Sequence, residues 1–281
     1  MNLRILVCTL LLFAGNAIAG VDPTPSDGAR PLSLGGAFSG VNGSFWSMFH
    51  NPAGLSGLNQ AQAGISLERR YLLSQLNQGS VALAMPFTDQ QAVGLAVQSF
   101  GFAGFRESDI QANYAIEILD KIRFGAALHY ASLQIQDYGS GSVVYADVGL
   151  QAQVNNEISV GFSAFNVNRA RLQTLNGDEF IPTIVSAGIA YQPTEKVMVV
   201  ADVQKDIDHP LSFRGGIEYE IVPEFTIRSG VSTEPLSLNA GFGLKLSQFK
   251  LETAFRLQEQ LGFTPHLSLS FAFGQKKDAD S

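Results

Sequence analysis

The sequence predicts an all-β protein: a transmembrane antiparallel β-barrel of about 14 strands with an N-terminal helical and coil hatch in its lumen. Three observations predict this fold. The chain opens with an apolar leader, a long series of segments alternates apolar and polar residues, and short connections alternate with longer ones. Short turns at one end of a barrel and longer loops at the other are typical of outer-membrane proteins.

The first 19 residues are typical of a secretory signal peptide, with Arg4 near the start, an apolar run, and small residues before Gly20. The apolar run is too short to span a bilayer as a helix. Cys8, the only cysteine, lies in this leader, so we expect a mature chain without disulfides, thiolate metal sites or cysteine nucleophiles. The expected regions are signal peptide 1–19, hatch 20–60, barrel 61–273 and polar periplasmic tail 274–281.

The composition disfavours one class of partner and favours another. The formal net charge is −7, and nucleic acid is therefore not an expected partner, because its phosphates require a basic face. Only 15% of the residues are charged, which is low for a soluble domain. We expect outer-membrane lipids around the barrel, and a location in the outer membrane of a Gram-negative bacterium after export to the periplasm.

From residue 61 onward, apolar and polar positions alternate. Leu267, Leu269 and Phe271, for example, face opposite to Ser268 and Ser270. A period of two with one apolar and one polar face indicates a strand between two different media. The expected strands are 62–69, 77–87, 91–100, 106–118, 121–134, 143–153, 157–167, 182–192, 196–204, 211–221, 224–231, 237–246, 249–257 and 265–273.

The connections between these strands also distinguish two ends of the barrel. Short ones, such as 88–89 and 155–156, alternate with longer ones, such as 70–76 and 168–181. With an even strand count, both termini are expected on the short-turn, periplasmic side. A soluble sandwich or barrel would also alternate, but here the polar face is rich in Gly, Ala and Ser, and the other face carries tyrosines near strand ends, as an interfacial girdle does. These tyrosines are Tyr114, Tyr130, Tyr191 and Tyr219.

The stretch from Asp27 to Leu58 lacks this alternation. Pro31 suits the first turn of a helix whose apolar stripe runs to Val41, and a second helix is expected through 45–49. We expect the stretch to lie inside the barrel and close it. The alternative is an arm outside the fold, where its aromatic cluster would need another cover. The predicted hatch and lumen residues are Arg30, Gly35, Gly36, Phe38, Phe45, Trp46, Phe49, Asn51 and Pro52.

Charged residues on the inward faces of the strands are a second group of candidate site residues. An unpaired charge is costly in a lumen of low dielectric, so a nearly balanced set favours cross-strand ion pairs that hold the hatch. The alternative is a charged polar path for a solute. The predicted lumen charge network is Arg123, Asp147, Asp202, Arg214, Glu218, Arg228, Lys245, Glu252 and Arg256.

No catalytic, cofactor or metal site is predicted. His266, Ser268 and Ser270 share one face, which suggests a base and a nucleophile, but no third group to orient the base is evident. No pair of histidines or carboxylates has the spacing of metal ligands. We therefore expect a protein that is not an enzyme and needs no cofactor.

Three short motifs resemble a known group: Gly28-Ala29-Arg30, Leu34 to Phe38, and Asn51 to Leu55. They are similar to the N-terminal signature of the long-chain fatty-acid transporter (FadL-like) superfamily, and most similar to its PorV/PorQ-like branch, which is associated with type IX secretion. The resemblance implies a fourteen-stranded barrel with a hatch in the lumen. Two departures are Gly43-Ser44 in place of an acidic pair, and the polar tail after the last strand.

The resemblance implies two alternative functions. The first is a non-enzymatic accessory of type IX protein secretion, with secretion components or cargo as partners. The second is a channel for uptake of hydrophobic small molecules such as fatty acids or aromatics. Connections of roughly six residues, near the ordinary median, favour the accessory, because only the loop over 168–181 is long enough to reach a partner. The candidate contact residues of that loop are Arg169, Arg171, Asp178 and Glu179.

Overall fold

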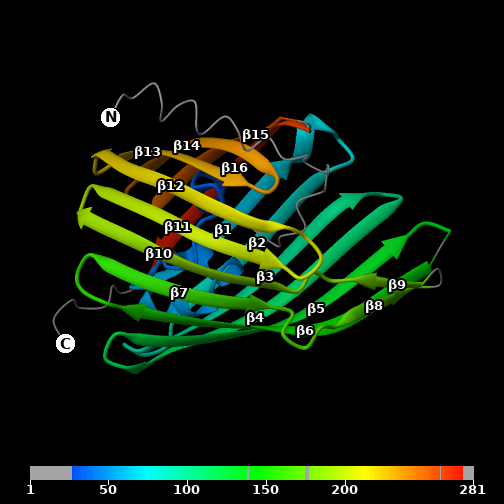
Figure 1. The fold of residues 1–281 in the computed structure, drawn as a ribbon, viewed down its shortest axis with the longest axis horizontal. Coiled ribbons are helices and arrows are strands. Elements are labelled where there is room, and N and C mark those ends of the chain that lie inside the picture. The colour runs from blue at the N-terminus through cyan, green and yellow to red at the C-terminus, as the bar shows by residue number, and fades with distance from the viewer. Residues whose placement is uncertain (1–26, 138, 175–176, 260, 275–281) are drawn as a thin grey trace.

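The computed structural model describes residues 27–137, 139–174, 177–259 and 261–274, with only the backbone for 173–180. The expected signal peptide and nearly all of the polar tail lie outside the described residues. Within them, fourteen strands form one closed antiparallel barrel, which confirms the predicted fold class. Figure 1 shows the strands inclined around a lumen that contains the N-terminal segment.

The barrel strands pair in chain order, β7 pairs with β10, and β16 closes the barrel on β1. Their ends lie within four residues of the predicted ones, and the largest difference is the earlier start of β6. The strands are β1 (Ala61–Arg69), β2 (Asn77–Pro86), β3 (Gln91–Phe102), β4 (Phe105–Leu119), β5 (Ile122–Ile135), β6 (Gly139–Gln153), β7 (Ile158–Phe165), β10 (Ile184–Thr194), β11 (Val197–Asp206), β12 (Leu211–Val222), β13 (Phe225–Thr233), β14 (Leu236–Leu246), β15 (Phe249–Gln258) and β16 (Gly262–Phe273).

The first helical element is shorter than predicted, whereas the second covers the predicted residues 45–49 as a 3₁₀ helix. The helical elements are α2 (Ala29–Ser33) and the 3₁₀ helices η1 (Phe45–Phe49), η2 (Pro52–Gly57) and η3 (Arg70–Leu72). The prediction of a helix reaching Val41 was wrong, because Gly35 and Gly36 have φ angles of 72° and 80° and turn the chain into the left-handed region. In the described part of the chain, no helix is long and apolar enough to cross a bilayer.

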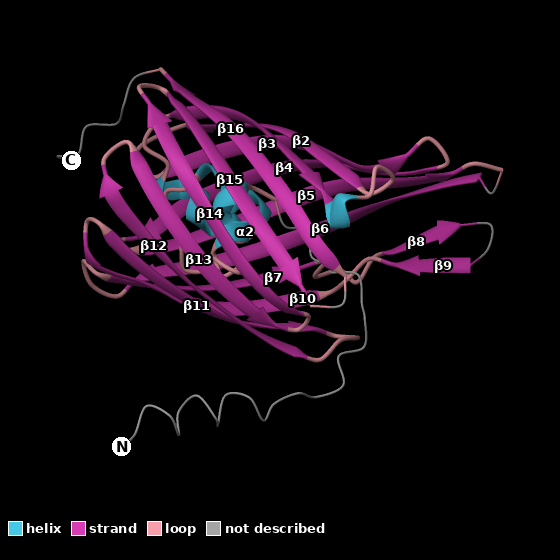
Figure 2. Ribbon diagram, turned by 90° about the horizontal axis from the view of Figure 1, so that it is seen from above, coloured by secondary structure: helices cyan, strands magenta, loops and turns pink. Residues whose placement is uncertain are grey.

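The long loop after β7 also differs from its prediction. It contains a separate hairpin of β8 (Arg171–Thr174) and β9 (Gly177–Phe180), which lies beside β6. The neighbouring strands are long: β4 and β6 have 15 residues and β5 has 14, whereas about 9–11 suffice to cross a membrane. Figures 1 and 2 show that the barrel is therefore taller on this side.

The outer surface of the barrel is apolar. Val81, Leu95 and Leu128 are 62%, 60% and 57% exposed, while their inward neighbours, such as Ser80 and His129, are buried. An apolar surface that encircles the molecule is stable in lipid and not in water. The four predicted girdle tyrosines all lie on this outer face, 39–48% exposed.

We predict that Val81→Arg destabilises the barrel by about 2–4 kcal/mol, because Val81 lies at the middle of β2 between Ile65 and Val97 and would bring a charge into hydrocarbon. Guanidinium unfolding in lipid vesicles measures the loss. Val154→Arg is the matched control, since Val154 is 60% exposed but lies in the short connection between β6 and β7. Equal stability of both variants would contradict a lipid-facing belt.

Candidate functional site

The site is the lumen with the hatch, defined here as residues 27–58, docked inside it. Eight of the nine predicted hatch residues are buried, and Arg30 is half-buried. Phe38, Trp46 and Phe49 are at most 2% exposed and form one apolar cluster with wall residues such as Ala84. The hatch therefore fills the cross-section of the lumen where it lies.

Glycines in the wall make this close fit possible. A Cβ atom added to Gly161 would lie 1.8 Å from the carbonyl oxygen of Ser39, and one added to Gly125 would lie 2.2 Å from the backbone nitrogen of Ala53. No side chain fits at these positions, because the hatch backbone occupies the space. Gly216 and Gly230 also face the hatch backbone, and the wall glycines that face hatch side chains are Gly64, Gly94, Gly149 and Gly241.

The Asn51-Pro52 turn has a specific anchor. The Asn51 side-chain amide donates to the carbonyl oxygens of Ser39, at 2.7 Å, and Leu150, at 3.1 Å. Its Oδ1 accepts from the backbone N–H of Ala53 and so caps η2. One side chain thus joins two parts of the hatch to strand β6.

A cluster of charges holds the start of the hatch to strands β12, β13 and β15. The Arg30 guanidinium makes two contacts of 2.8 Å with the Glu218 carboxylate. Arg228 bridges Glu218, at 2.5 Å, and Glu252, at 3.0 Å. The indole N–H of Trp46 donates to Glu252 at 3.1 Å. Each buried carboxylate is thus paired, as burial of charge requires.

The other predicted lumen charges lie elsewhere, so the structure separates the predicted set into several groups. Arg123 pairs with Glu117 at 2.9 Å, and Asp147 lies 2.9 Å from His129. The placement of the remaining four is as follows: Asp202 accepts from the hatch at Ser39, Arg214 is opposite Asp202 on β12, Lys245 is exposed, and Arg256 lies 3.4 Å from Asn239.

A second polar cluster joins Asp27 to the wall. The Ser66 hydroxyl donates to Asp27 at 2.6 Å and lies 2.5 Å from Nε2 of His266, whose Nδ1 lies 3.0 Å from Glu68. These distances resemble a nucleophile, a base and an orienting carboxylate, but Asp27 occupies the space in front of the hydroxyl. His266 has carboxylates at both nitrogens, 3.4 Å from Asp27 and 3.0 Å from Glu68, so it acts as a bridge between carboxylates.

The long loop between β7 and β10 is fixed at its base by Asn166, which is fully buried. Its backbone N–H donates to Asp147, and its side chain bonds the backbone of Ala170 and the carbonyl of Ile181. Of the predicted loop residues, Arg169 and Arg171 are exposed. Asp178 and Glu179 lie in β9, where the side chains are not described.

Several of these residues were not among the predicted site residues, although all join separate elements. Asp27, Asn166 and His129 were not considered, and His266 was considered only as a catalytic base and rejected. The two histidines had a usable signal, because their position on the polar face of a strand places them in the lumen. In the described ranges, no group of three or more His, Cys, Asp or Glu side chains is arranged to hold a metal ion.

Comparison with known structures identifies the fold. TbuX, a toluene transporter of Ralstonia pickettii, matches with a TM-score of 0.68 and 14% identity over 90% of this chain and 100% of that one. CymD, a monoaromatic hydrocarbon channel, matches with 0.70 and 13% over 90% and 99%. A FadL homologue of Pseudomonas aeruginosa matches with 0.60 and 12% over 93% and 100%.

The fold and the apolar outer surface together define the class: an outer-membrane β-barrel with the fourteen-stranded, FadL-like architecture. No protein-family model and no curated protein sequence matches the chain. At 12–14% identity, the likeness establishes the architecture, and function has to be argued from the residues of this chain.

We predict that Gly161→Ala destabilises the protein by about 1–3 kcal/mol and raises its conductance in planar bilayers, because the new methyl group displaces the hatch at Ser39. Gly215→Ala is the matched control, since its Cβ would meet only the carbonyl of Val200 at an ordinary 3.5 Å. Identical thermal unfolding and conductance of the two variants would contradict this account of the packing.

We also predict that Arg228→Met costs about 3–5 kcal/mol, since it leaves the Glu218 and Glu252 carboxylates short of a partner in a buried place. Its side chain is only 1% exposed. The emission of Trp46 should shift as well, because its indole N–H bonds Glu252. Arg123→Met, at the half-buried pair with Glu117, should cost less and leave Trp46 emission unchanged.

Proposed function

We propose that this protein is a channel that admits hydrophobic small molecules through the outer membrane. The proposal rests on the tall side of the barrel, strands β3 to β6. On these strands the polarity of the outer and inner faces reverses between the membrane belt and the end that carries the long loops. The architecture shared with a toluene transporter and a monoaromatic hydrocarbon channel supports the proposal.

Within the membrane belt, the outward positions of these strands are apolar. One lateral row joins Val97, Ile110, Tyr130 and Val144 across four neighbouring strands. Four residues further toward the loop end, the outward row is polar. That row joins Gly101, Arg106, Gln134 and Ser140.

The inward face changes in the opposite sense. Deep in the lumen it is polar. Near the loop end it carries Phe102, Phe105, Leu133, Ile135 and Val143, with Glu107 and Asp109 among them. Phe102 is 46% exposed, so part of this apolar surface is open to a solute. An apolar molecule that leaves water gains free energy on such a surface, at roughly 25 cal/mol per Å² buried.

The hatch separates this apolar surface from the periplasm. Because the hatch is buried against the wall on all sides, passage requires a local movement of the hatch or of its neighbours. The arrangement suits selective uptake better than free diffusion: a solute first binds at the extracellular end, and binding precedes passage.

The accessory of type IX secretion is the second candidate function. Its support is the N-terminal signature of the PorV/PorQ-like branch together with the β8–β9 hairpin. This hairpin forms a sheet of its own outside the barrel sheet and could contact a protein partner. The reversal of polarity favours the channel, because an accessory has no need of an apolar inner surface. A mild-detergent pull-down from native membranes separates the two: stoichiometric secretion components would favour the accessory, and a bound apolar molecule without them the channel.

We predict that Phe102→Ser combined with Ile135→Ser lowers toluene uptake several-fold with little loss of stability, since neither side chain is fully buried. The measurement is the initial rate of labelled toluene uptake by cells that lack their own hydrocarbon channels. Gln134→Ser is the control, because Gln134 lies beside Ile135 on the outer face of the same strand. Uptake at the level of empty cells by the unaltered protein would refute the channel.

A further inference from the structure

A continuous path of polar contacts runs from the inner wall of the tall side to the base of the long loop between β7 and β10. It starts at His129 on β5, which is 3% exposed. Nδ1 of His129 lies 2.9 Å from Oδ1 of Asp109 on β4, and Nε2 lies 2.9 Å from Oδ2 of Asp147 on β6. One buried ring therefore lies between two carboxylates from the neighbouring strands.

Tyr145 completes this cluster. Its ring stacks on the imidazole of His129, with centroids 4.3 Å apart and an interplanar angle of 11°. Its hydroxyl donates to Oδ2 of Asp109 at 2.9 Å, so both oxygens of that carboxylate have a partner. The cluster thus holds the imidazole in one orientation, with a carboxylate beside each nitrogen.

Asp147 continues the path to the loop. Its Oδ1 accepts from the backbone N–H of Asn166 at 2.8 Å, directly after the end of β7. The side chain of Asn166 then bonds both ends of the loop: it accepts from the N–H of Ala170 at 2.7 Å and donates to the carbonyl of Ile181 at 3.0 Å. The inner wall is thus connected to both ends of the loop through two side chains.

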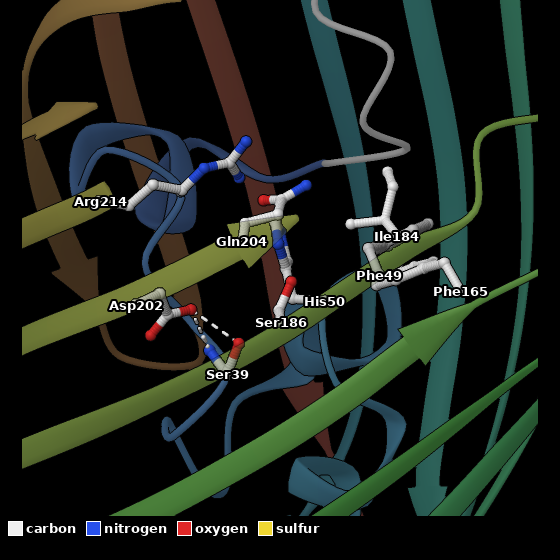
Figure 3. Close-up of a pocket in the computed structure, with 10 residues that line it drawn as sticks. Ser39, Phe49, His50, Phe165, Ile184, Ser186, Asp202, Gln204 and Arg214 are labelled. Carbon is white, nitrogen blue, oxygen red and sulfur yellow. Dashed lines mark hydrogen bonds between the residues drawn. The ribbon is translucent and has the colours of Figure 1, made fainter. Parts of the chain in front are cut away.

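The base of the loop also lies beside the hatch. Phe165, the last residue of β7, and Ile184, the first of β10, are paired across the sheet. Figure 3 shows both beside Phe49 of the hatch, where the three line one side of a small pocket. All three are buried, at 8% exposure or less. The position of the loop base therefore affects residues that share a pocket with the hatch.

The contacts of His129 depend on its charge. A neutral imidazole carries one proton, so one of its two nitrogens presents a lone pair. A lone pair 2.9 Å from the carboxylate of Asp147 or Asp109 is repulsive and leaves that buried carboxylate without its donor. Only the ring that is protonated at both nitrogens, with its positive charge, favours both carboxylates at once.

The other charged groups around the ring do not replace this charge. On β4, Glu107 adds a further negative charge to the same inner face. On β8, beside β6, the charged residue is Arg171, which is exposed. The part of the hatch that contacts β4, β5 and β6 is η2, which has no titratable side chain. His129 therefore supplies the positive charge that pairs with Asp147.

We propose that His129 is a proton-dependent link between the inner wall and the long loop. While the ring is charged, Asp147 stays in place, holds Asn166, and so fixes both ends of the loop. Loss of the ring proton as the pH rises weakens the hold on Asp147, and the base of the loop becomes mobile. The inference goes beyond the proposed function and does not depend on it, because it concerns the loop base and not the solute.

The test uses a spin label at Val167, which directly follows Asn166 and is 43% exposed. The only cysteine, Cys8, lies in the leader, so Val167→Cys gives a single labelling site. Electron paramagnetic resonance measures the mobility of the label on the purified protein in lipid vesicles, between about pH 6 and about pH 10, above the ordinary range of carboxylates. We expect the mobility to rise several-fold with pH. A label at Ser74, exposed in the loop between β1 and β2, should show no such rise.

Two variants should abolish the pH response from opposite starting states. His129→Gln removes the charge, so the label should be mobile at every pH. Asp147→Asn keeps an oxygen that accepts from Asn166 and needs no positive partner, so the label should stay immobile at every pH. If His129→Gln does not fold, Asp147→Asn alone decides. An unchanged response in Asp147→Asn, or no response in the unaltered protein, would overturn the inference.

Two further variants are controls for other titratable groups. His209→Gln changes a histidine in the loop between β11 and β12, which pairs with Asp206 at 2.9 Å. Tyr145→Phe removes the phenol proton beside the ring of His129. Both variants should keep the pH response. Loss of the response in either would show that another group carries the proton, and the link at His129 would be refuted.

Discussion

The hatch and the wall meet backbone to backbone, and the rest of the structure depends on this contact. Where the carbonyl of Ser39 faces Gly161, or the amide of Ala53 faces Gly125, the space between the two chains holds no side chain at all. Such contacts are sensitive to displacements of a fraction of an ångström, because dispersion forces fall steeply with distance. Steric complementarity between the two backbones therefore sets the position of the hatch, and the ion pairs and hydrogen bonds stabilise it there.

The anchors are distributed unevenly along the hatch. Its first residues carry charged anchors, Asp27 at His266 and Arg30 at Glu218. The 3₁₀ helices η1 and η2 are held by apolar packing, by the indole N–H of Trp46 at Glu252, and by the amide of Asn51. Polar anchors of this kind lose strength when water enters, and apolar packing does not depend on local charge. The two halves also contact each other, because Nε2 of His50 lies 3.0 Å from the carbonyl oxygen of Asp27 and a Cβ atom added to Gly28 would lie 2.6 Å from the Trp46 ring.

The strands were predictable because their signal is local: the alternation of apolar and polar residues is present in each segment by itself. It fails where both faces are small and polar, and the four residues from Gly139 to Ser142 at the start of β6 were missed for this reason. Which charges pair was not predictable, because the register between strands decides that Glu218 lies opposite Arg228, and register depends on the whole barrel.

The hatch was harder to predict for another reason. Its apolar stripe has helical spacing, yet the positive φ angles of Gly35 and Gly36 end the helix after α2, and those angles follow from contact with Val231 and Arg214 on distant strands. Asn166 shows the same limit: an isolated asparagine in a loop carries no local sign that its side chain will bond two segments eleven residues apart, at Ala170 and Ile181. The conformation and the bonding partners of such residues depend on contacts with distant parts of the chain, which the local sequence does not reveal.

The unequal height of the barrel rim has a consequence for the direction from which molecules arrive. Strands β3 to β6 rise on one side only, and at their loop end the outer surface is polar while the inner one carries aromatic and aliphatic side chains beside Glu107 and Asp109. A molecule that diffuses along the cell surface toward the outside of this wall meets Arg106 and Gln134 and finds nothing to bind it, whereas one that approaches from the low side of the rim meets the apolar face directly. In the proposed channel, the rate of encounter with solutes thus depends on the direction of approach, and neighbouring proteins packed against the low side would shield the entrance more than those behind the tall wall.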